Sequence, residues 1–70
     1  MERFKTLLTA DELATLEALA NDGAFQMTPD GAHRFLCTMR DSLREDGEDD
    51  EATRWAYRVQ DFNMGMYGRI

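Results

Sequence analysis

The sequence contains one cysteine, one histidine and one proline, and it lacks any long apolar run. A single cysteine cannot form an internal disulfide, and one cysteine with one histidine cannot supply the roughly four ligands of a structural zinc site. Because no stretch of about 18 apolar residues occurs, we expect no transmembrane helix. Residues 1–5 also lack the apolar stretch of a signal peptide. We therefore expect a cytoplasmic protein without a cofactor.

The chain has 70 residues, of which 43% are apolar. This apolar share is typical of a folded chain, and the length fits one domain. We therefore expect a single helical domain over residues 1–70. A domain of this size buries only about 60% of the surface that its unfolded chain exposes, so we expect its stability to be marginal.

The negative charge is concentrated in one segment. The net charge is -6, from 14 acidic and 8 basic residues. Residues 45–51 hold six of the acidic residues and no basic one, so the rest of the chain has eight of each and is formally neutral. Clustered charge creates a focused potential, whereas dispersed charge mainly affects solubility.

The first clear helix signal begins at Thr9. Glu12 stands three residues later, and the two side chains suit a capping box. We expect a helix over about Ala10–Asp22, ended by Gly23 in a left-handed conformation. One face of this helix carries apolar residues at helical spacing: Leu13, Leu16, Leu19 and Ala20. Residues 1–8 are ambiguous between a short helix and an edge strand.

A second helix is predicted from Thr28, as the N-cap, and Pro29, in the first turn, to about Glu45. Its apolar residues follow a helical period: Ala32, Phe35, Leu36, Met39 and Leu43. Thr28 to Gly31 also resembles a hairpin turn. The alternative fold is therefore α+β, with a short hairpin around Thr28–Gly31.

A third helix is predicted to begin near Asp49 or Asp50, with either residue as its cap. Its apolar positions are Trp55, Val59, Phe62 and Met66. Gly65 and Gly68 should weaken the helix beyond Asn63. The apolar tail over residues 64–70 should fold back on the core or meet a partner. We therefore predict an all-α fold, a small three-helix bundle with an acidic turn between the second and third helices.

The acidic turn and the tryptophan that follows it are the candidate partner-binding site. Its residues are Glu45, Asp46, Glu48, Asp49, Asp50, Glu51 and Trp55. An EF-hand that places Gly47 at position 6 has Thr53 where the bidentate glutamate is needed, so we predict no metal site. Capping and solvation account for residues 49–51, but Glu45 and Asp46 end a helix, where its dipole disfavours anions. One hypothesis is therefore that the cluster only caps the helix and is solvated. The other is that it imitates nucleic-acid phosphates.

His33 and Cys37 are spaced for one helix face, which they share with Arg40 and Arg44. They could form half a metal site or a nucleophile pair, but the sequence reveals no third group to orient the histidine. We therefore predict no catalytic residues and no enzyme activity. Seven of the eight basic residues are arginines near acids, which argues against direct nucleic-acid binding.

A short, acidic, single-domain chain with this cluster at residues 45–51 resembles the small phage-encoded inhibitors, including the anti-CRISPR proteins. The resemblance concerns size and charge and involves no motif. It implies a non-enzymatic protein in the host bacterial cytoplasm, whose acidic patch docks on the basic surface of a nucleic-acid-binding protein and blocks it. The alternative is a structural or regulatory interaction module, such as an antitoxin-like or accessory subunit, which uses its apolar face and tail and could form a homodimer.

Overall fold

The computed structural model describes residues 3–68, most of which are helical. The helices are α1 (Arg3–Thr6), α2 (Ala10–Asn21), α3 (Pro29–Glu45) and α4 (Asp49–Tyr67), and no strand occurs within residues 3–68. The predicted all-α class is confirmed, and the three long helices are those that the sequence predicts. The ambiguous segment before residue 9 contains the additional short helix α1.

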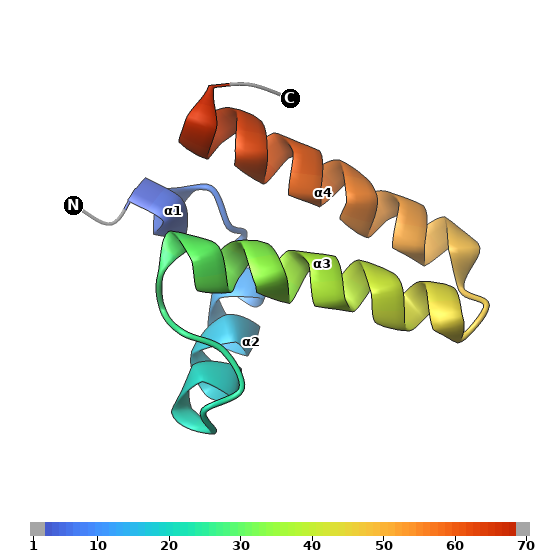
Figure 1. The fold of residues 1–70 in the computed structure, drawn as a ribbon, viewed down its shortest axis with the longest axis horizontal. Helices are drawn as coiled ribbons and strands as arrows, with labels where there is room; N and C mark the ends of the chain where they lie inside the picture. Colours follow the sequence, from blue (N-terminus) through green and yellow to red (C-terminus); the bar gives the residue numbers. More distant parts are fainter. Residues whose placement is uncertain (1–2, 69–70) are drawn as a thin grey trace.

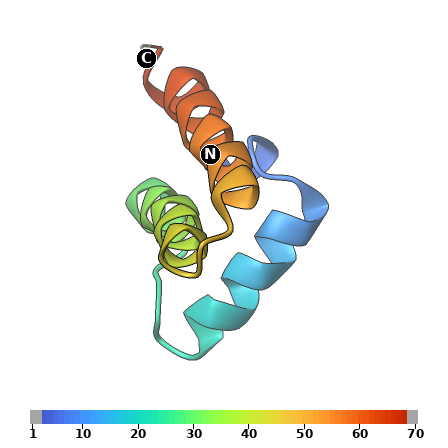
Figure 2. The same cartoon turned by 90° about the vertical axis from the view of Figure 1, so that its right-hand side faces the viewer.

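The long helices α3 and α4 form an antiparallel hairpin (Figure 1). They make the most extensive contact between helices in the described chain. Helix α2 runs across this hairpin rather than along it, and Figure 2 shows α2 to one side of both helices. Helix α1 lies against α4. The acidic turn joins α3 to α4 and therefore forms one end of the hairpin.

The alternative prediction, a hairpin around Thr28–Gly31, is wrong, because α3 begins at Pro29. The Thr28 hydroxyl accepts a hydrogen bond from the Gly31 N–H at 3.0 Å, and Pro29 opens the helix. The preceding loop folds back onto this first turn. A Cβ at Gly31 would overlap the carbonyl oxygen of Gln26, so glycine is what allows the close approach.

Both turns between long helices use the same backbone motif. After α3, the Gly47 N–H donates to the Arg44 carbonyl and the Glu48 N–H to that of Leu43, at 3.1 and 2.9 Å. Gly47 has a φ of 82°, and this pattern is a Schellman motif. The residues around Gly23 repeat it at the end of α2, as the sequence predicts.

The predicted caps of α4 need correction. Its N-cap is Glu48, which makes no side-chain capping hydrogen bond, and neither Asp49 nor Asp50 caps the helix. These two residues and Glu51 occupy the first turn instead. The Schellman motif reverses the chain at Gly47, so α4 already begins at Asp49. With Asp49 as the cap, the helix would begin one residue later.

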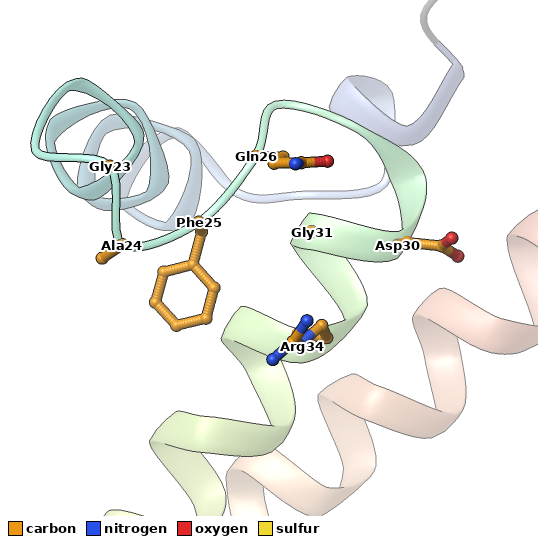
Figure 3. Close-up of a pocket in the computed structure, with 7 residues that line it drawn as sticks. All are labelled: Gly23, Ala24, Phe25, Gln26, Asp30, Gly31 and Arg34. Atoms are coloured by element: carbon orange, nitrogen blue, oxygen red, sulfur yellow. The ribbon is translucent and has the colours of Figure 1, made fainter.

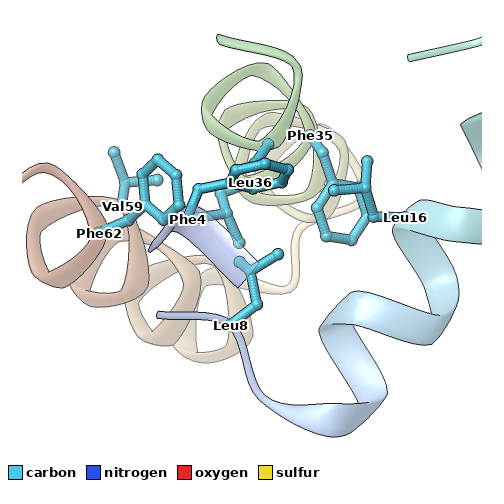
Figure 4. Close-up of a cluster of buried hydrophobic side chains, with 8 residues drawn as sticks. Phe4, Leu8, Leu16, Phe35, Leu36, Val59 and Phe62 are labelled. Carbon is cyan, nitrogen blue, oxygen red and sulfur yellow. The ribbon is translucent and has the colours of Figure 1, made fainter. Parts of the chain in front are cut away.

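All four helices contribute to one apolar core (Figure 4). Its largest fully buried side chains come from α2, α3 and α4: Leu16, Phe35, Leu36 and Phe62. Two residues of the N-terminal segment, Phe4 of α1 and Leu8, also belong to this core. The buried positions follow the helical periods predicted for the three long helices.

The expectation that α4 weakens after Asn63 is wrong, because the helix continues to Tyr67. Its last turns are packed: Met66 contacts the core cluster, and a Cβ at Gly65 would lie 2.7 Å from the Leu7 side chain. Gly68, with a φ of 70°, then ends the helix. The apolar tail does not fold back: it continues α4, with Met66 on the core side and Met64 and Tyr67 exposed. Residues 69 and 70 lie outside the described residues.

One charged network ties α2 to α4. The predicted capping box is present: the Glu12 N–H donates to the Thr9 hydroxyl, and the Thr9 N–H donates to Glu12 Oε1, at 3.1 and 2.9 Å. Arg58 of α4 donates to both oxygens of the same carboxylate at 2.8 Å. Its guanidinium also donates to the Leu7 carbonyl at 2.8 Å. Arg58 also forms a looser ion pair with Asp61, at 3.5 Å.

The Glu12 carboxylate is buried in this network, with 8% of its side chain exposed. Burial raises the pKa of Glu12, but the hydrogen bonds from Arg58 and Thr9 outweigh it and bring the pKa below 4.5. The hydrogen bond to Glu12 likewise raises the pKa of Arg58. Both groups are therefore charged at neutral pH, in a bidentate geometry that suits a guanidinium and a carboxylate.

Replacing Arg58 with methionine should lower the free energy of unfolding by about 2–3 kcal/mol, because Glu12 is left buried without its partner. The loss stays below that of a fully buried pair because 26% of the Arg58 side chain is exposed. Arg54→Met is the matched control, since the Arg54 side chain is 80% exposed and its ion pair with Glu51 is long, at 3.7 Å. Urea denaturation measures both variants, and equal losses would show that the network adds nothing.

The same network predicts a pH dependence. Since the pKa of Glu12 is lower in the folded chain than in the unfolded one, its carboxylate stabilises the fold above about pH 4.5. The contribution disappears as the pH falls through the folded-state pKa. The difference in unfolding free energy between the wild type and Glu12→Gln should be constant near neutral pH and shrink below about pH 4.5. A difference unchanged down to about pH 3 would contradict this assignment.

Gly31→Ala should destabilise the protein by about 2 kcal/mol or more, despite the better helix propensity of alanine, because the new methyl group meets the Gln26 backbone. Gly65→Ala is the control: there the nearest atoms are the ends of the Leu7 side chain, which can turn aside. Thermal denaturation compares them. A Gly31→Ala variant as stable as Gly65→Ala would show that the loop moves freely.

Candidate functional site

The acidic turn, residues 45–51, forms the exposed end of the α3–α4 hairpin (Figure 1). All seven of its residues are exposed. Glu45 is the last residue of α3, Asp46 is its C-cap, and Glu48 precedes α4. As predicted, the six carboxylates lie together at one end of the hairpin.

Almost none of this charge is neutralised locally. Within residues 3–68, the one ion pair that the turn forms joins Glu51 to Arg54, at 3.7 Å and with both side chains mostly exposed. Asp50, which is also spaced for a pair with Arg54, forms none there. Because exposed pairs of this kind are weak, the turn presents nearly its full charge to solvent.

The backbone of the turn fixes where the carboxylates lie. Asp49, Asp50 and Glu51 stand in the first turn of α4, where the helix dipole favours anions. Glu45 and Asp46 stand at the end of α3, where the dipole disfavours them by about 0.3–1 kcal/mol each. The two acids at the end of α3 are therefore a cost to the fold that capping does not explain.

Trp55 stands on α4, four residues after Glu51, and packs toward the core. Its ring packs edge-on against Phe35, with centroids 6.1 Å apart, and it is half-buried against the core. Its predicted part in partner binding stays a prediction. The large apolar side chains that are most exposed lie farther along α4: Tyr57, Met64 and Tyr67.

An open groove runs between α3 and α4 beside the acidic turn. It encloses about 480 Å³. Two arginines of α3 line one side, and an aromatic and several small or polar residues of α4 line the other: Arg40, Arg44, Thr53, Ala56, Tyr57, Val59 and Gln60. Arg40 pairs with its neighbour Asp41 at 3.0 Å.

A second pocket, of about 320 Å³, lies between the loop after α2 and the start of α3 (Figure 3). Its charged lining residues are Asp30 and Arg34, both exposed. The Phe25 ring, which packs edge-on against Phe35, forms another part of the wall. One exposed acid and one exposed base do not make a reactive centre, so this pocket suggests no chemistry.

The expectation that nothing orients His33 is wrong. Its Nε2 lies 3.3 Å from Cys37 Sγ, and its Nδ1 lies 2.9 Å from Asn63 Oδ1. Asn63 comes from α4, thirty residues away in the chain. The four-residue spacing of His33 and Cys37 can be recognised within α3, but only the packing of α3 against α4 brings Asn63 to the histidine.

The described residues hold no group of three or more His, Cys, Asp or Glu side chains arranged for a metal ion. None of their helices is long and apolar enough for a membrane span. The acidic turn itself is an exposed patch of six carboxylates. Comparisons of the chain with protein-family models, curated proteins and solved structures found no match.

Proposed function

We propose that the protein is a non-enzymatic inhibitor that docks its acidic turn on the basic, nucleic-acid-binding surface of a target protein and so blocks access to that surface. The observation that supports this is the turn itself. Six exposed carboxylates stand on a short backbone that main-chain hydrogen bonds hold in place, and they form one weak ion pair within the described chain. The resemblance in size and charge to the anti-CRISPR proteins agrees with it.

The charge density is comparable with that of a nucleic acid. Duplex DNA carries one charge about every 1.7 Å along its axis, so six charges correspond to about 10 Å of duplex. Packed helices lie about 8–10 Å apart, which makes the end of the hairpin about as wide as that segment. Since the Debye length at physiological salt is about 8 Å, the six carboxylates act on a partner as one patch.

The alternative function is a structural or regulatory interaction module that binds through apolar contacts. Tyr57, Met64 and Tyr67 favour it, because all three are large, exposed and on α4. Such a partner, or a second copy of this chain, would stay bound at high salt. The acidic residues would then serve to stabilise the first turn of α4 through the helix dipole and to keep the protein soluble.

The triple variant Glu48→Lys, Asp49→Lys, Asp50→Lys should abolish capture of a nucleic-acid-binding protein from a bacterial lysate. The wild-type protein should capture it at about 50 mM salt and lose it at about 500 mM, because screening removes the attraction. Added duplex DNA should compete with the capture. The readout is affinity capture on tagged protein, followed by mass spectrometry.

The matched control is the triple variant Asp11→Lys, Glu17→Lys, Asp22→Lys, which makes the same change in net charge on exposed residues at and around α2. It should leave capture intact. Equal losses in the two triple variants would mean that net charge, not the turn, attracts the partner. A partner retained at high salt, and lost when the chain is truncated after Phe62, would instead support the apolar interaction module.

A further inference from the structure

An uncharged stripe of exposed residues runs along α4. Every large apolar side chain that is exposed in the described part of the chain belongs to it: Tyr57, Met64 and Tyr67. Thr53 and Gln60 stand on the same stripe and are exposed as well. None of these five residues is charged, in a chain of which 31% of the residues are charged. Exposed apolar groups gathered on one helix face in this way indicate a contact surface.

The spacing of the stripe is that of a coiled-coil seam. Its positions are alternately four and three residues apart: 53, 57, 60, 64 and 67. The core-facing residues of α4 follow the same period of 3.5 residues: Ala52, Trp55, Val59, Phe62 and Met66. At 3.6 residues per turn, the two seams lie roughly 140° apart around the helix. One seam packs on the core, and the exposed seam has the pattern by which a helix pairs with another helix.

The surroundings of the stripe leave room for a second helix. Helix α4 lies along one edge of the described chain (Figure 1). Thr53, Tyr57 and Gln60 of the stripe also line the open groove of about 480 Å³ between α3 and α4. The stripe is therefore bordered by a hollow that can receive side chains of another helix, as ridges of one helix enter the grooves of the next.

Two opposite charges flank the stripe on the side away from α3. Arg54 directly follows Thr53 and Asp61 directly follows Gln60, so both stand at the same position of the seven-residue repeat. Their side chains are 80% and 71% exposed, and each makes only a loose ion pair within its own chain, at 3.7 and 3.5 Å. When two copies of α4 pack antiparallel, Arg54 of each copy comes close to Asp61 of the other. This flank is therefore complementary to its own reverse.

The acidic turn disfavours the parallel arrangement. Parallel α4 helices would place residues 45–51 of the two copies side by side, with six carboxylates on each, and these would repel one another. In the antiparallel arrangement the turns are separated by the length of α4, which has 19 residues. This length is about 28 Å, well beyond the Debye length of about 8 Å at physiological salt.

We propose that the stripe is the contact surface of a homodimer, in which the α4 helices of two copies pack antiparallel about a two-fold axis. The axis passes between Tyr57 and Gln60, so Tyr57 of each copy lies level with Gln60 of the other, and Thr53 lies level with Met64. A methionine adapts to irregular gaps, which suits Met64 to the groove beside Thr53. The tyrosines supply the aromatic area that is typical of interface cores. The contact is independent of the docking proposed for the acidic turn, and it leaves one turn at each end of the dimer.

Sedimentation velocity of the full-length protein tests the proposal. One helix per copy buries less than the roughly 800 Å² per partner of a standard interface, so the dimer should dissociate on dilution. Between about 5 and about 500 µM protein, the mass should rise from that of a monomer toward that of a dimer. Tyr57→Glu with Met64→Glu should hold the mass at that of the 8.1 kDa chain throughout.

The matched control is Ala14→Glu with Ala18→Glu, which adds the same charges at exposed apolar positions of α2. This variant should dimerise like the wild type. Circular dichroism verifies that both double variants keep their helices. Equal loss of the dimer in the two variants would mean that added charge, not the stripe, controls association, and would overturn the proposal.

A charge exchange tests the register. Arg54→Asp alone and Asp61→Arg alone should each raise the dimer dissociation constant about threefold or more, because both symmetric pairs become repulsive. The two substitutions together restore opposite charges at the net charge of the wild type, and should recover most of the association. Effects on each chain alone would add up instead of cancelling, so failure of the double variant to recover would overturn the proposed register.

Disulfide formation tests the orientation. In a Cys37→Ser background, Gln60→Cys lies near the two-fold axis and should link two copies under mild oxidation. Thr53→Cys should not, because its two copies lie about 16 Å apart along the helices, beyond the reach of a disulfide. Links at both positions would show a parallel pair and overturn the proposal. A monomer at every protein concentration would also overturn it, and would leave the stripe to a different protein.

Discussion

The arrangement of the helices depends on the contact between Arg58 and Glu12. The α3–α4 hairpin is joined by a short turn, but α2 lies across it and shares only part of the core. Arg58 reaches from α4 to the Glu12 carboxylate and to the Leu7 carbonyl, so it anchors both the start of α2 and the segment before it. Glu12 at the same time closes the capping box with Thr9. One carboxylate thus sets both where α2 begins and how it docks.

The surface divides along the hairpin according to charge. The acidic turn at one end is held by main-chain hydrogen bonds and contributes nothing to the core. The groove beside it has two arginines, and the row formed by His33, Cys37 and Asn63 lies nearer the other end. The proposed docking of the turn therefore involves none of the residues of that row.

Most of the fold could be predicted from the sequence because its signals are local. The capping box at Thr9, the Thr28 cap and the Gly23 and Gly47 turns each involve residues within a few positions of one another. Apart from the caps of α4, which the local turn at Gly47 decides, the errors come from contacts between residues far apart in the chain. The glycine-rich end of α4 stays helical because Leu7 and the core pack against it. The partners of Arg58 and of His33 lie on other helices, and no spacing rule along the chain reveals Glu12 or Asn63.

The Schellman turn at Gly47 also bears on how this surface can evolve. Its geometry is set by two main-chain hydrogen bonds and one positive φ. It therefore requires glycine at position 47 and places few constraints on the side chains at the neighbouring positions. The side chains at the other six positions of the turn can be exchanged while the path of the chain is kept. Natural selection can therefore alter the number and pattern of charges there one mutation at a time, with little loss of stability.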